Sequence, residues 1–402
     1  MRLLHVIHSM NPAGGGPVES LTRAASIMAR HGHSTEVLFL DTPGASWLGN
    51  LPFTVHALGP ARGTYGYAPA LAPWLRDHAS RYDVVVVHGL WQYPSFACWR
   101  ALRNSSTPYV VFTHGMLDPW FKRAYPLKHL KKWMYWPWAE YRVLRDAAAV
   151  LFTCEKERIL ARESFWLYRC NEVVVNYGAA APSAEKGAQE SSFFALHPKL
   201  KGKRIALFLG RIHAKKGCDL LIEAFSEVLA RDPDWRLVIA GPDQVGWQAT
   251  LTELAREKSV EHLITWPGMI SGDVKYGAIK AAEVFVLPSH QENFGIAVAE
   301  ALGCATPVLI SEKVNIWHEV QEDGAGIVAS DDLAGTRSLL LSWIKMSEAE
   351  RSAMREKARS CFERRFHIEK AAESLVRVLA SVHDRRQSAL KSSPSLGFTS
   401  NG

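Results

Sequence analysis

The sequence predicts an α/β protein of two domains, each a parallel sheet covered by helices on both faces. Short runs rich in valine, isoleucine and leucine alternate with helical patterns, which is typical of such sheets. A chain of 402 residues is also too long for one ordinary domain. Small and polar residues prevail over 183–203 without a sustained period, which predicts a linker. The expected domains therefore span 1–182 and 204–365.

The first domain is expected to contain strands at 3–8, 35–40, 53–58, 83–88, 108–113, 147–153 and 172–176. The first strand leads into a glycine-rich turn at 11–17 and then a helical pattern from Val18 to His31. Backbone N–H groups of such a turn can approach a phosphate closely, although a plain flexible turn is the alternative. The glycine spacing is not Gly-x-Gly-x-x-Gly, so no dinucleotide site is indicated.

The second domain repeats the pattern, with strands expected at 204–209, 236–240, 262–265, 284–287, 307–310 and 326–328. Helical patterns accompany them at 218–231, 250–258, 274–282, 295–302, 333–346 and 348–362. A further amphipathic helix is expected within 366–385. Residues 386–402 are rich in serine and other polar residues, and we expect them to be disordered.

The composition limits the kind of partner. A formal net charge of +7 and a pI of about 9.0 favour an anionic partner, such as a nucleotide, a lipid phosphate, a membrane surface or a nucleic acid. The six cysteines contain no Cys-x-x-Cys pair, which indicates reduced thiols rather than a zinc site or a disulfide framework. The first residues are too polar for a signal peptide, and no apolar run approaches about 18 residues. These features predict a cytoplasmic protein.

Two histidines follow predicted strands of the first half. His88 and His114 each stand at the carboxyl end of a strand and each precedes a glycine. Ligands of open α/β sheets bind at that edge, where a histidine can bond a sugar hydroxyl or transfer a proton. A histidine that merely caps the strand end is the alternative.

Basic and aromatic residues alternate over 120–145. The segment holds seven lysines or arginines, eight aromatic residues and one glutamate. This mixture suits a membrane interface, where cations meet lipid phosphates and indoles lie at the headgroup level. It also suits single-stranded nucleic acid, and a helix with a solvated basic face is the plain alternative. Because the chain shows no nucleic-acid motif, we expect membrane contact and no nucleic-acid partner.

A basic loop opens the second half. Arg211 and Lys216 lie between the strand 204–209 and the helix that follows, so both can point at one anion. Arginine supplies a fork of donors and lysine a compact charge. A diphosphate that gains charge as a leaving group needs such stabilisation. A chance basic loop is the alternative.

Two glutamates flank the start of a predicted helix near Asn293. Glu292 precedes this helix and Glu300 stands eight positions later. Glycosidases hold two carboxylates roughly 5–10 Å apart, whereas eight helical residues rise about 12 Å. The pair is better placed to touch two parts of one long ligand, such as the sugar and the ribose of a sugar nucleotide. A solvated helix with two chance glutamates is the alternative.

These motifs, in this order and spacing, resemble glycosyltransferase family four, retaining enzymes of the GT-B fold. The resemblance covers residues 1–385. It rests on the glycine-rich turn, His114-Gly115, Gly210-Arg211 with Lys216-Gly217, and Pro288-Ser289 leading to Glu292, Phe294-Gly295 and Glu300.

The resemblance implies two Rossmann-like domains facing across a cleft, with the acceptor in the first and the sugar nucleotide in the second. The last helix would cross back to the first domain. The implied catalytic residues are His114, Arg211, Lys216 and Glu292. The implied donor contacts are Gly15, Gly16, Gly241, Met269, Phe294, Gly295, Ile296 and Glu300. Arg211 and Lys216 would hold the diphosphate, Glu292 the sugar hydroxyls and Glu300 the ribose.

Members of this family generally need no metal, and no Asp-x-Asp stands in a candidate metal-binding loop here. We therefore expect neither a metal nor another cofactor. Arg211 and Lys216 would take the place of the metal. A front-face displacement assisted by the leaving phosphate fits the lack of an obvious nucleophile.

The chain departs from many relatives after the strand 307–310, where Ser311 to Trp317 replace a glycine pair and a glutamate. With His114 to Trp120, this segment looks like a subgroup associated with bacterial exopolysaccharide or lipopolysaccharide assembly. Acceptors there are often polyprenyl-diphosphate-linked sugars at the inner leaflet, and Asn315 and Glu319 could contact the donor. The expected function is hexose transfer from a UDP- or GDP-sugar to such a glycan. The alternatives are a sugar-nucleotide 2-epimerase and a non-catalytic glycan- or membrane-binding protein.

Overall fold

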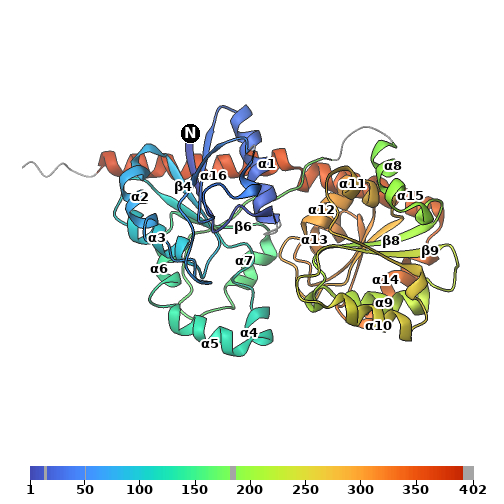
Figure 1. The fold of residues 1–402 in the computed structure, drawn as a ribbon. Coiled ribbons are helices and arrows are strands. Elements are labelled where there is room, and N and C mark those ends of the chain that lie inside the picture. The colour runs from blue at the N-terminus through green and yellow to red at the C-terminus, as the bar shows by residue number, and fades with distance from the viewer. Residues whose placement is uncertain (13–15, 50, 182–186, 393–402) are drawn as a thin grey trace, which may run out of the picture. The chain divides into compact units, whose positions relative to one another are not determined.

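The chain forms two α/β units (Figure 1). The computed structural model describes residues 1–12, 16–49, 51–181 and 187–392. One unit combines Met1–Asn176 with the chain from Glu369 onward, and the other spans Tyr177–Ile368. The predicted fold class is confirmed.

Within the described residues, the first unit has a seven-stranded parallel sheet in the order β3-β2-β1-β4-β5-β6-β7. The strands are β1 (Arg2–Val6), β2 (Ser34–Phe39), β3 (Thr54–Ala57), β4 (Val84–His88), β5 (Tyr109–Phe112), β6 (Ala149–Phe152) and β7 (Glu172–Val174). The valines of β4 are fully buried, because helices cover both faces of a parallel sheet. This explains why the central strands read as unbroken apolar runs.

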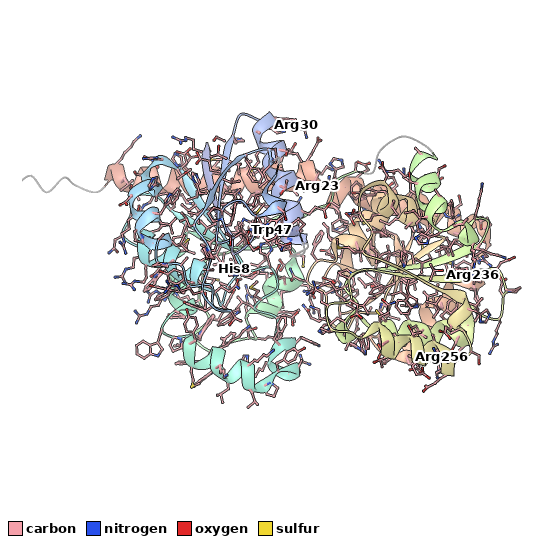
Figure 2. All side chains as sticks on the ribbon, in the orientation of Figure 1. His8, Arg23, Arg30, Trp47, Arg236 and Arg256 are labelled. Atoms are coloured by element: carbon pink, nitrogen blue, oxygen red, sulfur yellow. The ribbon has the colours of Figure 1, made fainter. Side chains whose placement is uncertain are left out.

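The helices of this unit follow the strands along the chain. They are α1 (Gly16–Arg30), α2 (Leu71–His78), α3 (Tyr93–Leu102), α4 (Trp120–Ala124), α5 (Pro126–Tyr135), α6 (Glu140–Asp146), α7 (Glu155–Ala161) and α16 (Ile368–Ser392). Arg30, labelled in Figure 2, forms an ion pair with Glu369 at 3.2 Å, which joins the end of α1 to the start of α16.

The second unit has, in its described part, a six-stranded parallel sheet in the order β10-β9-β8-β11-β12-β13. Its strands are β8 (Arg204–Leu209), β9 (Trp235–Ala240), β10 (Ile264–Gly268), β11 (Val284–Leu287), β12 (Val308–Ser311) and β13 (Gly326–Ala329). Its helices are α8 (Ala188–Leu196), α9 (Cys218–Val228), α10 (Gln248–Glu257), α11 (Gly272–Ala281), α12 (Ile296–Gly303), α13 (Trp317–Glu322), α14 (Leu333–Lys345) and α15 (Glu348–Cys361). Ser347 and Glu350 form a capping box that begins α15.

The segment predicted as a linker, 183–203, differs in the structure. Residues 188–196 form α8, which belongs to the second unit and packs against α11. Phe193 is fully buried, and Gln189 donates to Asp273 at 2.9 Å. A short helix with one large buried side chain has too weak a pattern to stand out from a polar sequence.

The tail predicted to be disordered also differs in part. Helix α16 continues to Ser392, so residues 386–392 are helical. Arg386 donates to the carbonyls of Ser105 and Ser106, which fixes this end of α16 on the first unit. Residues 393–402 lie outside the described part of the chain.

Candidate active site

Each sheet has one point where its strand order reverses, and most of the predicted site residues follow the strands there. The reversal lies between β1 and β4 in the first unit and between β8 and β11 in the second. Ligands of open α/β sheets bind outside the carboxyl ends of the strands at such points. The two units are therefore described in turn.

In the second unit, the loop after β8 lies against the loop after β11. Gly217, the N-cap residue of α9, has φ +68°, and a Cβ atom there would stand 2.2 Å from the carbonyl oxygen of Pro288. The N–H of His290 donates to the carbonyl of Lys215 at 2.8 Å. Only a glycine at 217 allows the two loops to approach so closely. This approach places Lys216 beside the loop that carries Glu292.

Lys216 and Glu292, both predicted catalytic residues, form an ion pair. Lys216 is buried, at 7% exposed, and Glu292 is half-buried. Burial lowers the pKa of Lys216 well below its usual value, and the cations Lys215 and Arg211 lower it further. The adjacent carboxylate acts in the opposite direction, because it stabilises the ammonium. The charge of Lys216 therefore depends on Glu292.

Arg211, the third predicted residue of this clamp, is exposed. Its charge lowers the pKa values of both His213 and Lys216, so its guanidinium lies within electrostatic range of the ion pair. An exposed guanidinium and a buried ammonium near it can engage one anion together.

The segment from Ser311 to Trp317, in which this chain differs from many relatives, holds the backbone of Glu292. Glu292 N–H donates to Lys313 O at 3.0 Å, and Asn315 N–H donates to Glu292 O at 3.0 Å. Ser311 Oγ donates to the carbonyl of Ser289 at 2.5 Å. This segment thus fixes the loop from which Glu292 projects. Asn315 itself is buried, and its side-chain nitrogen has no hydrogen-bond partner among the described residues.

The remaining predicted residues around α12 have varied surroundings. Glu300 is 3% exposed and forms an ion pair with Lys275 of α11 at 2.6 Å. The ring of Phe294 is buried and packs edge-on against Tyr177 and Phe366, with centroids 5.0 and 5.6 Å away. Gly295 directly precedes α12, and Ile296 is its first residue. The Phe294 side chain is thus a packing residue, and only its backbone remains a predicted donor contact.

Two further predicted donor contacts follow β9 and β10. Gly241 has φ +146°, and a Cβ atom there would lie 1.8 Å from the carbonyl oxygen of Gly210. Met269 follows Gly268, the last residue of β10, and is 68% exposed. Gly241 therefore lets the ends of β8 and β9 approach closely, while the Met269 side chain is accessible.

In the first unit, His114 follows β5 with φ +48° and is half-buried. Its loop is held by Glu157 of α7, which is 4% exposed. One oxygen of this carboxylate accepts from Thr113 Oγ1 and Gly115 N–H, both at 2.6 Å. The other accepts from the N–H and the hydroxyl of Thr153, both at 2.7 Å. Glu157 therefore ties the end of β5 to the end of β6.

The sequence analysis missed Glu157 because nothing in its local pattern sets it apart from the neighbouring Glu155. A glutamate two positions into a short helix is ordinary, and two of its four donors, on Thr113 and Gly115, are distant in sequence. Of the glycine-rich turn, Gly16 begins α1, whereas Gly15 lies outside the described residues. Within the described ranges, no group of three or more histidine, cysteine, aspartate or glutamate side chains is placed to hold a metal ion.

Two family models match the chain in succession. Residues 15–178 match the glycosyl transferase 4-like domain, and residues 190–361 match the glycosyl transferases group 1 domain. Together the two matches cover most of both units. The chain belongs to glycosyltransferase family four. The predicted family and the predicted enzyme class are confirmed.

Known proteins similar to this glycosyltransferase include enzymes of several kinds. The GDP-mannose:cellobiosyl-diphosphopolyprenol alpha-mannosyltransferase of Xanthomonas campestris is 25% identical over 345 residues, which cover 83% of this chain and 84% of that enzyme. The structure of sucrose-phosphate synthase from Thermosynechococcus elongatus has a TM-score of 0.77 at 17% identity, covering 96% of this chain and 99% of that one. HepE of Anabaena, in complex with UDP and glucose, has a TM-score of 0.73 at 16% identity, covering 95% and 100%. The likeness to these structures shows the shared GT-B fold.

Proposed function

We propose that this glycosyltransferase is a retaining, metal-independent enzyme of bacterial surface polysaccharide assembly. It moves a hexose from a UDP- or GDP-sugar to a glycan carried on a polyprenyl diphosphate. The observation that carries the proposal is the ion pair of Lys216 with Glu292 at the reversal point of the second sheet, with Arg211 exposed nearby. Two cations and a carboxylate suit a diphosphate joined to a sugar with several hydroxyls.

The proposed reaction assigns a role to each of these residues. The bond between the anomeric carbon and the diphosphate oxygen breaks, and the acceptor hydroxyl bonds to the same carbon from the same face. The hydroxyl proton passes to the leaving diphosphate oxygen. Arg211 and Lys216 stabilise the negative charge of the diphosphate, and Glu292 accepts hydrogen bonds from the donor-sugar hydroxyls. No metal takes part, because the two side chains supply the positive charge.

Similar proteins support the proposed substrates. The Xanthomonas relative takes GDP-mannose as donor and a diphosphopolyprenol-linked acceptor, as its name states. HepE of Anabaena binds UDP and glucose in its structure. Neither protein decides between the two nucleotides for this chain.

Helix α5 supports an acceptor presented by a membrane. Its outer surface carries the exposed apolar side chains of Leu127, Leu130, Trp133 and Met134, together with the exposed Lys128 and Lys131. Apolar side chains among lysines suit the boundary between acyl chains and anionic headgroups. Among the described helices, none is long and apolar enough to cross a bilayer. We infer that α5 rests on the cytoplasmic face of the inner membrane.

A thermal-shift screen tests the donor site. The purified protein is heated with UDP, GDP, ADP, dTDP and their sugar conjugates, with and without EDTA. A nucleotide at 100 times its Kd should stabilise the folded protein by about 2.7 kcal/mol. We expect a shift with UDP- or GDP-sugars that EDTA does not change. Lys216→Ala should abolish the shift, whereas Lys313→Ala, an exposed lysine paired with Glu312, should retain it.

Three results would contradict the proposal. If no nucleotide shifts the unfolding temperature, the predicted donor site is wrong. If EDTA abolishes the shift, donor binding depends on a metal, and the metal-independent proposal is wrong. If NMR of the transfer product shows an inverted anomeric centre, the retaining mechanism is wrong.

A further inference from the structure

Three histidines of the first unit form one hydrogen-bonded line. His5 lies on β1, His88 ends β4 and His114 follows β5, and these three strands are neighbours in the sheet. Nδ1 of His5 lies 2.9 Å from Nε2 of His88, and Nδ1 of His88 lies 3.0 Å from Nε2 of His114. Successive ring planes are inclined by 25° and 14°, with centroids 5.2 and 5.3 Å apart, so the rings lie side by side as in-plane N–H···N bonds require. Every bond of the line joins two ring nitrogens.

The three rings are neutral at neutral pH. Burial lowers the pKa of His5 to about 4 and that of His114 to about 4. It also lowers the pKa of His88 well below the usual value, and the two neighbouring histidines lower it further. A neutral imidazole has one N–H donor and one acceptor nitrogen. The line therefore has only two neutral arrangements, in which all protons lie on Nδ1 or all lie on Nε2.

The inner end of the line distinguishes these arrangements. Nε2 of His5 is buried and has no hydrogen-bond partner in the part of the chain that the structure describes. If the protons lie on Nδ1, this nitrogen keeps an unshared lone pair. If they lie on Nε2, it is a buried N–H without an acceptor. Orphaned buried N–H groups are rarer in proteins than under-satisfied acceptors, so the Nδ1–H arrangement is favoured.

We propose that His5 and His88 are positioning residues that fix His114 as its Nδ1–H tautomer. His5 Nδ1–H donates to His88 Nε2, and His88 Nδ1–H donates to His114 Nε2. His114 then has an N–H donor at Nδ1 and no free basic nitrogen. A bound sugar oxygen meets a hydrogen-bond donor there, and a proton-accepting role of His114 is excluded. The tautomer stands on its own, and only the identity of this ligand rests on the proposed function.

NMR of protein labelled with ¹⁵N-histidine tests this tautomer without any substrate. Two-bond couplings between ring nitrogens and carbon-bound protons distinguish Nδ1–H, Nε2–H and protonated rings. Variants that each lack one of the three histidines assign the signals. We expect Nδ1–H for all three at pH 7, although free histidine prefers Nε2–H in water. An Nε2–H or protonated His114 would overturn the proposal.

A matched pair of variants tests the coupling along the line. In His5→Asn, the amide nitrogen replaces Nδ1, and donation is again favoured because the opposite orientation would bury two unpaired N–H groups. In His5→Leu, the donor is lost. His114 should remain Nδ1–H in His5→Asn and become a mixture of tautomers in His5→Leu. An unchanged His114 in a folded His5→Leu variant would overturn the coupling.

A second pair of variants keeps the coupling testable if His5→Leu does not fold. If circular dichroism shows that His5→Leu does not fold, His88→Asn and His88→Leu provide the same contrast at a half-buried position next to His114. His114 should keep its Nδ1–H form only in His88→Asn, and an equal result in both variants would overturn the coupling. A protein that binds no nucleotide would contradict the proposed function and leave these tautomers unaffected.

Discussion

At the reversal point of the second sheet a buried lysine and a glutamate form an ion pair, whereas at that of the first sheet three neutral histidines bond one another. Arg211 adds an exposed charge to the second site. At the first site the carboxylate of Glu157 accepts hydrogen bonds from four donors of the protein itself. The same type of sheet edge thus carries charge in one unit and fixed neutral groups in the other.

This difference suits two kinds of ligand. A diphosphate needs positive charge, which Arg211 and the Lys216 ammonium paired with Glu292 can supply. An acceptor or sugar hydroxyl needs a hydrogen bond of fixed direction, which a neutral imidazole with one tautomer supplies. The second site should therefore tolerate loss of charge poorly, and the first site should tolerate loss of hydrogen-bond geometry poorly.

The largest effect is expected at the charged site. With the nucleotide sugar that the thermal screen identifies, Lys216→Ala should lower kcat/KM for transfer by about 10²–10³. Removing one preorganised hydrogen-bond donor to the developing negative charge costs about 2.7–4 kcal/mol. Glu292→Gln should also lower it, since Lys216 then loses the carboxylate that keeps it charged. The double variant should lose less than the product of the two single losses.

The control for this prediction is Lys313→Ala, which removes an exposed lysine side chain from the segment after β12 that holds the backbone of Glu292. Its kcat/KM should stay within about twofold, because an exposed ion pair contributes about 0.2–1 kcal/mol or less. Equal losses in Lys216→Ala and Lys313→Ala would mean that general positive charge, and not the buried pair, supports transfer.

The next effect is expected at Glu157. Glu157→Gln places an NH₂ group against two hydrogen-bond donors, and the first unit should lose about 3 kcal/mol of stability because charge-assisted bonds are replaced by unsatisfied groups. Urea unfolding followed by tryptophan fluorescence measures this loss. Glu163→Gln, an exposed glutamate just beyond α7, is the matched control and should change little. A loss of less than about 0.5 kcal/mol in Glu157→Gln would contradict the role of this carboxylate as a tie between β5 and β6.

Much of the fold could be predicted from the sequence because buried parallel strands are unbroken apolar runs. The run at 83–88 corresponds to β4, and the run at 284–287 corresponds to β11. Helix α8 could not be predicted, because its place in the core depends on Phe193 meeting α11, which is distant in sequence. The end of α16 was missed for a similar reason, since Arg386 is held by carbonyls near position 105.

The candidate site could be predicted only as far as residue type and loop position allow. The predicted clamp follows two strands: Arg211 and Lys216 come after β8, and Glu292 comes after β11. These strands are parallel neighbours, so their carboxyl ends lie side by side, and the structure brings Lys216 and Glu292 into contact. The pairing of Glu300 with Lys275 could not be foreseen, because it depends on how α11 lies against α12. The line from His5 to His114 likewise depends on strand order, which places β4 between β1 and β5.

A smaller effect is expected on the free energy of unfolding when pH is lowered, and it tests whether the His5 ring is neutral. The pKa of His5 is about 4 in the folded chain and 6.5 in the unfolded chain. The unfolded chain therefore binds the extra proton between these values, and the folded state loses stability as pH falls through this window. From pH 7 to pH 5 the contribution of His5 should fall by about 2 kcal/mol. His5→Leu should remove this part of the pH dependence in urea unfolding, whereas His31→Gln, at an exposed position, should retain it. An identical acid dependence in wild type and His5→Leu would show that the His5 ring is not held neutral.

The smallest effect is expected on membrane binding, which we assign to helix α5 of the first unit. Lys131 is exposed on α5 between Leu130 and Met134, and Lys201 is an exposed lysine of the second unit without such apolar neighbours. Lys131→Ala should weaken binding to vesicles containing phosphatidylglycerol about fivefold, since one lysine near an anionic surface contributes about 1 kcal/mol. Leu130→Glu should weaken binding to anionic and to neutral vesicles alike, because it removes apolar contact as well. Lys201→Ala should leave co-sedimentation unchanged. If Lys131→Ala and Lys201→Ala weaken binding equally, the protein is attracted by its net charge alone, and α5 is not a membrane-binding helix.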